Sequence, residues 1–181
     1  MPSVPASLTD IRLAIVAAIV FAAMLIEARR ASRNERAQRA RGGIEPPGDV
    51  YRLMRIVYPG AFLAMLAEGA WRGAPAPGVI AAGAVVFGAA KALKWWAILS
   101  LGPSWTFRVI VVPGARLVVG GPYRWLRHPN YVAVIGELFG AAALAGAPVA
   151  GVAAIAIFGA LVARRIAVED RALRTPRTAA R

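Results

Sequence analysis

Long apolar runs alternate with charged segments along the chain, and Gly- and Pro-rich turns separate several of them. Because a helix rises about 1.5 Å per residue, about 20 apolar residues cross a hydrocarbon core of about 30 Å. The pattern therefore predicts an all-α fold, an integral membrane bundle of about five transmembrane helices in one domain, residues 1–181. The predicted spans are residues 8–28, 53–71, 79–101, 131–146 and 148–165.

The last two predicted spans lie in one apolar stretch, residues 131–163, which Gly-Ala-Pro at 146–148 divides. A single helix of this length would measure roughly 50 Å, more than a membrane needs, so we predict a short helical hairpin. A hairpin returns the chain to the face where it began. The two polar segments beside it, 102–130 and 164–175, are therefore expected to meet and form a cytosolic cofactor pocket.

The composition supports membrane insertion, since 59% of the residues are hydrophobic and the mean hydropathy is +0.58. An ordinary soluble domain is about 45–50% apolar. Arg12 is the only basic residue before the first apolar core, and no small-residue cleavage site precedes the basic stretch that follows it. We therefore expect a retained span and not a signal peptide.

The chain carries a net charge of +13, and its 22 Lys and Arg are distributed unevenly. Eighteen follow the first, third and fifth predicted spans, and only Arg12 and Arg72 lie on the opposite side. This bias places the N-terminus outside and the C-terminus in the cytosol, in a bacterial inner membrane. Lys91 and Lys94 lie in the third span, where we expect them to extend to an interface. Nucleic-acid binding is not expected, because no basic stripe lies on a predicted soluble element.

Two polar motifs flank the predicted hairpin. The first, residues 120–131, contains His128, the only histidine. The second, residues 165–173, contains an acidic pair, Glu169 and Asp170. Taken separately, each has an ordinary structural alternative: an interfacial loop before a helix, and a solvated helix face paired with nearby arginines. One histidine and no cysteine make a metal site unexpected, and a disulfide or a cysteine nucleophile is excluded.

The sequence Arg-His-Pro-Asn-Tyr at 127–131, the apolar hairpin, and an acidic pair with a leucine three residues beyond resemble the isoprenylcysteine carboxyl methyltransferase family. That family is itself similar to membrane phospholipid methyltransferases. The resemblance extends over about residues 30–173. Further stretches resemble a bacterial branch of the family, some of which is linked with O-methylation of long-chain alkylpyrones. These stretches are residues 32–36, 95–98, 101–108 and 111–115.

The resemblance implies S-adenosylmethionine as cofactor and assigns residues to its pocket. Carboxylates can hold the amino and ribose groups of the cofactor, and an arginine can bind its carboxylate. The family usually has Glu at both acidic positions, so Asp170 departs from it by one methylene. The cofactor-binding residues implied are Tyr123, Arg127, His128, Pro129, Tyr131, Arg165, Glu169 and Asp170.

Acidic residues inside predicted spans are functional candidates by default. We assign Glu137 and Arg108 as catalytic candidates, with Glu137 expected to orient the substrate or to pair with an arginine such as Arg108. The alternative for Glu137 is a structural ion pair or a helix–helix hydrogen bond. Trp105 and Glu68 are candidates for substrate binding. The alternatives are interfacial anchoring for Trp105 and Arg108, and an ion pair for Glu68.

The function predicted is O-methylation of a lipophilic acid, either an isoprenylcysteine-type carboxylate or an alkylpyrone-like enol. Such an acid is ionised near neutral pH and needs no strong base, which fits the absence of a Ser-His-Asp or Cys-His arrangement. Its apolar tail would enter from the bilayer, so lipids are expected partners. Two alternatives stay open: N-methylation of a phospholipid headgroup, and a non-enzymatic membrane scaffold or transporter subunit.

Overall fold

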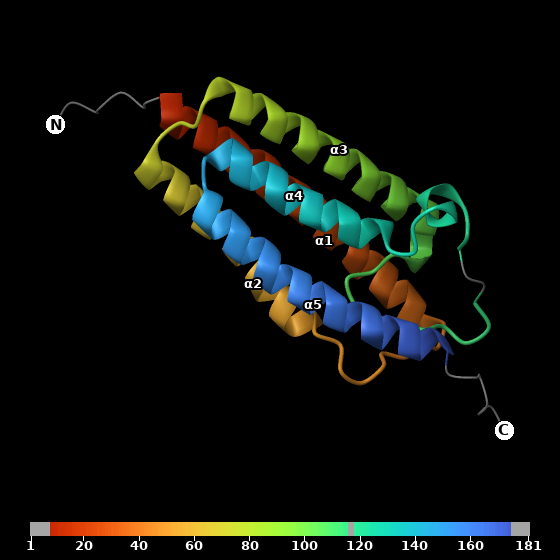
Figure 1. Cartoon of the computed structure of the whole chain (residues 1–181). Helices are drawn as coiled ribbons and strands as arrows, with labels where there is room; N and C mark the ends of the chain where they lie inside the picture. Colours follow the sequence, from red (N-terminus) through yellow and green to blue (C-terminus); the bar gives the residue numbers. More distant parts are fainter. Residues whose placement is uncertain (1–7, 116–117, 175–181) are drawn as a thin grey trace.

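Five helices lie side by side in the computed structural model, which describes residues 8–115 and 118–174 (Figure 1). Within these residues the only β contact is an isolated bridge between Ile44 and Val111. The all-α prediction is confirmed. The helices are α1 (Leu8–Ala40), α2 (Tyr51–Arg72), α3 (Pro77–Leu101), α4 (Pro129–Ala145) and α5 (Pro148–Arg174), with 3₁₀ turns at Gly102–Ser104 and Gly121–Arg124.

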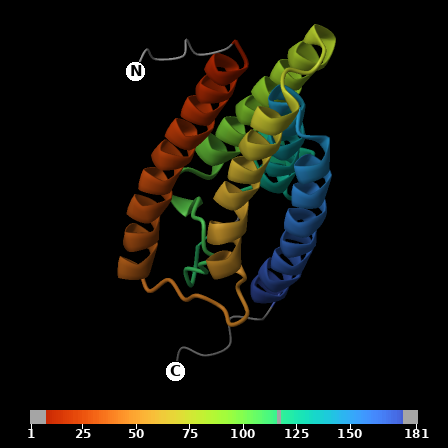
Figure 2. The same ribbon diagram turned by 90° about the vertical axis from the view of Figure 1, so that its left-hand side faces the viewer.

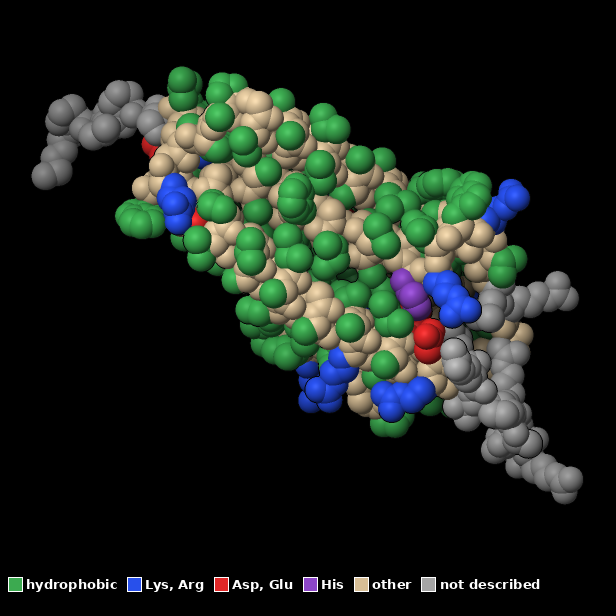
Figure 3. Space-filling model, in the orientation of Figure 1, with side chains coloured by type: hydrophobic (Ala, Val, Ile, Leu, Met, Phe, Trp, Pro, Cys, Tyr) green, Lys and Arg blue, Asp and Glu red, His purple; other side chains and the backbone are tan. Residues whose placement is uncertain are grey.

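Four of the helices, α1, α2, α3 and α5, are long and apolar enough to cross a membrane, and α4 is a shorter apolar helix of 17 residues. Hydrophobic side chains cover the middle of the visible face, and charged side chains gather towards its ends (Figure 3). Apolar side chains on the helices face outward; Val85 and Val152, for example, are each 71% exposed. The protein is therefore an integral multi-pass membrane protein, and its orientation stays a prediction.

Two helices continue past the predicted spans into the basic segments. Helix α1 runs on to Ala40, where Arg39 pairs with Glu35 one turn earlier, and it ends just before Gly42. Glycine at Gly42 adopts a φ of 78°, which a side chain disfavours. Helix α5 runs without a break from Pro148 into the basic segment. The hydropathy pattern predicts where the apolar part of a helix ends. The helix itself continues until a helix-breaking residue ends it.

Glycine allows α3 and α4 to pack closely. A Cβ added at Gly140 would lie 2.6 Å from the backbone nitrogen of Phe87, and one at Gly83 would lie 2.9 Å from the nitrogen of Leu144. Small residues let membrane helices approach in this way. Close van der Waals packing then stabilises the helix pair, because the hydrophobic effect does not drive helices together within lipid. The turn between α4 and α5 depends on Gly146, whose φ of 72° closes the end of α4.

A charge network joins three helices inside the bundle. Lys91 Nζ of α3 lies 2.9 Å from Glu27 Oε1 of α1 and 3.0 Å from Glu137 Oε1 of α4. Lys94 Nζ lies 2.7 Å from Glu27 Oε2 and 3.1 Å from Glu137 Oε2. Tyr58 of α2 donates a hydrogen bond to Glu137. Two ammonium groups and two carboxylates cancel, so no net charge is left in the apolar interior.

This network corrects the expectation that Lys91 and Lys94 extend to an interface. Lys94 is 2% exposed, and Glu27 and Glu137 are each 1% exposed. An uncompensated charge is costly in a bilayer, whereas a balanced cluster that also forms hydrogen bonds can be accommodated. The lysines are therefore structural partners of two acids and do not reach the headgroups.

We expect the replacement Lys94→Met to destabilise the protein by about 3–5 kcal/mol, because two buried carboxylates would then share one ammonium. The double variant Lys94→Met/Glu137→Gln restores charge balance and should recover part of that loss. Unfolding of the purified protein in detergent measures both, with Arg52→Gln on an exposed site as the control. Strict additivity of the single losses in the double-mutant cycle would contradict the network.

Candidate cofactor and substrate pocket

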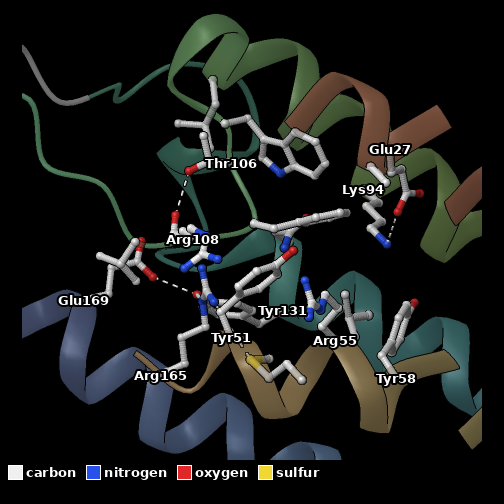
Figure 4. Close-up of a pocket in the computed structure, with 18 of the residues that line it drawn as sticks. Glu27, Tyr51, Arg55, Tyr58, Lys94, Thr106, Arg108, Tyr131, Arg165 and Glu169 are labelled. Carbon is white, nitrogen blue, oxygen red and sulfur yellow. Dashed lines mark hydrogen bonds and ion pairs between the residues drawn. The ribbon is translucent and has the colours of Figure 1, made fainter. Parts of the chain in front are cut away.

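A cavity of about 560 Å³ opens between the helices at the end of the bundle where α1 and α5 extend. This volume lies in the range of small-molecule sites, roughly 300–1,000 Å³. Its polar lining includes Tyr131, Arg165 and Glu169 at one side and Glu27 and Lys94 at the other (Figure 4). Apolar side chains line the space between helices: Phe21, Met24, Leu25, Met54, Val134 and Phe158.

The segment after α3 forms one wall of the cavity by turning back between α1 and α2 (Figure 2). The extension of α1 holds it in place. Asn34 Nδ2 donates to the carbonyl oxygens of Gly102 at 3.0 Å and Trp105 at 2.7 Å, and Gln38 Nε2 donates to that of Pro103 at 3.0 Å. Backbone groups with no helical partner are thereby satisfied by side chains.

The loop between α1 and α2 closes over the same wall. Ile44 and Val111 exchange backbone hydrogen bonds of 2.9 Å in both directions. Asp49 accepts hydrogen bonds from the backbone nitrogens of Tyr51 at 3.0 Å and Val109 at 2.9 Å. Two segments far apart in sequence thus become a single cover for the cavity.

The polar side of the cavity is a chain of hydrogen bonds across three elements. Tyr131 OH, in the first turn of α4, donates to Glu169 Oε2 at 2.8 Å and accepts from Arg165 Nε at 2.8 Å. Arg165 and Glu169 are four residues apart and share one face of α5. The guanidinium of Arg165 also pairs with Asp49 Oδ1 at 3.1 Å. The cluster therefore ties α4 and α5 to the cover.

His128 occupies the N-cap position of α4 without forming a side-chain capping hydrogen bond, and Pro129 lies in the first helical turn, as its fixed φ favours. The imidazole stacks on Tyr131, with ring centroids 5.5 Å apart. Its Nδ1 lies 4.0 Å from Glu169 Oε2 and its Nε2 lies 3.7 Å from Asp170 Oδ1. In Figure 3 a histidine and acidic side chains lie together at this end. The predicted meeting of the histidine loop with the acidic pair is confirmed, while the roles of these residues stay predictions.

The structure places the predicted site residues in two groups. Four of them do not line the cavity: Pro129 is buried, Asp170 lies beside His128, and Glu137 and Glu68 lie elsewhere. The residues that line the cavity are Trp105, Arg108, Tyr123, Arg127, His128, Tyr131, Arg165 and Glu169.

Glu137 does not pair with Arg108, and the contacts it makes are those of the structural alternative, ion pairs and a hydrogen bond between helices. Arg108 Nη1 pairs with Glu45 Oε1 at 2.8 Å, and its Nε lies 3.1 Å from Glu35 Oε1. Glu35 belongs to α1, and Glu45 belongs to the loop after it. Glu137 is instead held by the two lysines of α3.

Glu68 does not line this cavity, and its predicted structural alternative, an ion pair, is present. Glu68 Oε2 accepts from the backbone nitrogen of Ala150 at 2.6 Å, and Oε1 lies 2.6 Å from Arg72 Nε. It caps the first turn of α5, at the end of the bundle away from the polar cluster. A carboxylate is favoured there because the first amides of a helix have no partner within it.

Arg55 of α2 was not identified from the sequence, although it lines the cavity (Figure 4). It forms no hydrogen bond or ion pair with another residue that the structure describes. Arg55 is one of the eighteen basic residues predicted to lie on the cytosolic side. Its position inside the predicted span 53–71 was a usable signal, because intramembrane cations are rare and usually functional.

Burial and neighbouring charges fix the protonation states of Tyr123 and Glu45, which lie near the cover. Burial, followed by the charge of Glu169, raises the pKa of Tyr123, so its phenol stays protonated. Burial alone would raise the pKa of Glu45, but the hydrogen bonds from Arg39 and Arg108 outweigh it and lower that pKa below 4.5. Glu45 is therefore a carboxylate at neutral pH.

The lowered pKa of Glu45 predicts that acid releases the cover. Its contribution to stability is complete above the ordinary carboxyl pKa of 4.5 and is lost as the pH falls through the lowered value. Hydrogen–deuterium exchange of residues 102–112 should show protection factors that fall at acidic pH. Glu45→Gln should reduce protection at neutral pH and flatten this dependence; an unchanged pH profile in the variant would contradict the assignment.

Comparisons with known proteins identify the family of the chain. The family model described as isoprenylcysteine carboxyl methyltransferase (ICMT) matches residues 81–175. An uncharacterized protein of Bacillus subtilis (strain 168), YpbQ, is 34% identical over 158 residues, which cover 86% of this chain and 93% of YpbQ. No solved structure matches the chain significantly. The chain belongs to the isoprenylcysteine carboxyl methyltransferase family.

Proposed function

We propose that the protein is an S-adenosylmethionine-dependent membrane methyltransferase that O-methylates a lipophilic acidic substrate. One observation carries the proposal: a cluster of carboxylate, imidazole and guanidinium groups lies at one side of a cavity whose remaining wall is largely apolar and lies among membrane helices. A water-soluble cofactor and a substrate with an apolar tail can both reach such a cavity. Membership of the family supports methyl transfer as the reaction.

The polar cluster offers groups that fit S-adenosylmethionine. Glu169 engages Tyr131 and His128 through Oε2, which leaves its second oxygen for a ribose hydroxyl or an amino group. Arg127 lines the cavity and has no partner among the described residues, so it can bind the carboxylate of the cofactor. The stacked rings of His128 and Tyr131 provide an aromatic surface beside these charges.

The acceptor side favours an acid over an amine. Arg55 brings to the cavity a guanidinium that pairs with no other described residue, and charge-assisted hydrogen bonds from such a group hold a carboxylate or an enolate. Lys94 also lines the cavity, although two carboxylates already balance its charge. The apolar lining between these groups suits a hydrocarbon chain. An amine acceptor would gain nothing from Arg55 and would need a base to remove its proton.

When bound, S-adenosylmethionine would supply a methyl group on a positively charged sulfur, and transfer of this group to the acceptor oxygen would leave the electron pair of the broken C–S bond on sulfur. Arg55 would hold the ionised oxygen of the acceptor, and the polar cluster would orient the cofactor. The cover of residues 102–112 would exclude water. Positioning and water exclusion are sufficient because no proton has to be removed from an ionised acceptor.

We expect S-adenosylhomocysteine to stabilise the detergent-purified protein against thermal unfolding, by about 2.7 kcal/mol when its concentration is 100 times Kd. His128→Ala and Glu169→Ala should abolish this shift, because each removes a group of the polar cluster. Arg164→Ala, an exposed change on the same helix as Glu169, should retain it. A wild-type protein without any shift, or variants with the full shift, would reject the assigned pocket.

Labelled S-adenosylmethionine offered with single acceptors identifies the substrate class. We expect transfer to a long-chain hydroxypyrone or to farnesylcysteine and not to phosphatidylethanolamine. Arg55→Gln should raise KM for the acid at least about tenfold, with KM for the cofactor unchanged, because one charge-assisted hydrogen bond contributes about 1.5–3 kcal/mol. Arg52→Gln is the matched control on the same helix. Transfer to the phospholipid alone would favour N-methylation instead.

A further inference from the structure

A second cavity, of about 480 Å³, lies between α1 and α3 and shares no lining residue with the first. Its lining is basic and apolar, with no acidic side chain. The residues are Ile26, Arg29, Arg30, Arg33, Asn34 and Trp95. Four of them recur at positions 26, 29, 30 and 33, which share one face of α1. The cavity therefore lies where α1 passes from its apolar run into its basic extension.

The three arginines of this cavity are uncompensated. Among residues 8–115 and 118–174, none of Arg29, Arg30 and Arg33 forms a hydrogen bond or an ion pair. Arg30 Nε is buried and has no hydrogen-bond partner. Elsewhere on the same helix extension the chain does supply partners, since Arg39 pairs with both Glu35 and Glu45. A buried donor without a partner is unfavourable, so an external acceptor is expected at this cavity.

The chemistry of the cavity points to a phosphate attached to a hydrocarbon chain. Guanidinium groups bind phosphate oxygens in pairs, and three of them within one turn concentrate positive charge. A free phosphate would satisfy the arginines equally well, but it would make no use of Ile26, which is 53% exposed, or of the Trp95 indole. Tryptophan is typical of the headgroup level of a bilayer, and basic pockets between membrane helices bind anionic headgroups.

We propose that this cavity is a binding site for the headgroup of an anionic glycerophospholipid. The phosphate would lie among Arg29, Arg30 and Arg33, and an acyl chain would follow Ile26 along the lipid-facing side of α1. The proposal does not depend on the methyltransferase reaction. It depends only on the membrane location of α1 and α3.

Native mass spectrometry of the delipidated full chain in detergent tests the site by titration with phosphatidylglycerol and with phosphatidylcholine. We expect at least tenfold tighter binding of phosphatidylglycerol. The triple variant Arg29→Gln/Arg30→Gln/Arg33→Gln should lose this preference. The matched triple Arg36→Gln/Arg41→Gln/Arg164→Gln removes the same charge from exposed sites at the same end of the bundle and should keep it. Circular dichroism confirms that both triples are folded.

Three outcomes would overturn the proposal. Equal loss in both triples would show that overall charge, and not this cavity, attracts the lipid. Equal binding of phosphatidylglycerol and phosphatidylcholine would show that the net charge of the headgroup does not determine binding. Displacement of phosphatidylglycerol by inorganic phosphate at equal concentration would identify a free-anion site without any contribution from the lipid chain.

Discussion

The pairing of Glu27 and Glu137 with Lys91 and Lys94 is the constraint on which the bundle depends. Each group taken alone would be a charge in an apolar interior, and only the joint arrangement of α1, α3 and α4 neutralises all four. The network therefore selects one register of these helices against every other that buries the same apolar surface. Glu27 and Lys94 also line the cavity, so the residues that fix the helix register shape its inner wall.

The cavity is built from side chains of the helices and from the segments between them. Asp49 and Arg165 join the loop after α1 to α5, while Asn34 and Gln38 hold the segment after α3. Its polar groups are thus positioned by side chains on rigid helices, although much of its wall is irregular backbone. This division suits a site that must hold charged groups accurately while admitting ligands of different polarity.

The helices and the meeting of His128 with Glu169 could be predicted from the sequence. The length of an apolar run predicts a helix, and a helical hairpin returns the chain to the face where it began. The partners of Arg108 did not follow. They come from the extension of α1 and the loop beyond it, and the choice among acids depends on distances that no local pattern encodes. Lys94 was misplaced for the same reason, since a lysine near a predicted span end looks alike whether it meets lipid headgroups or a buried acid.

The chain order of the polar cluster has a consequence for biosynthesis. Asp49 is synthesised early and Tyr131 late, but Arg165 and Glu169 arrive only with the final helix. A nascent chain that has already inserted α1 to α4 thus lacks the groups that complete the ligand site. Assembly of the polar cluster and successful completion of translation are thereby coupled, and a prematurely terminated product would occupy the membrane without Arg165 and Glu169 beside Tyr131.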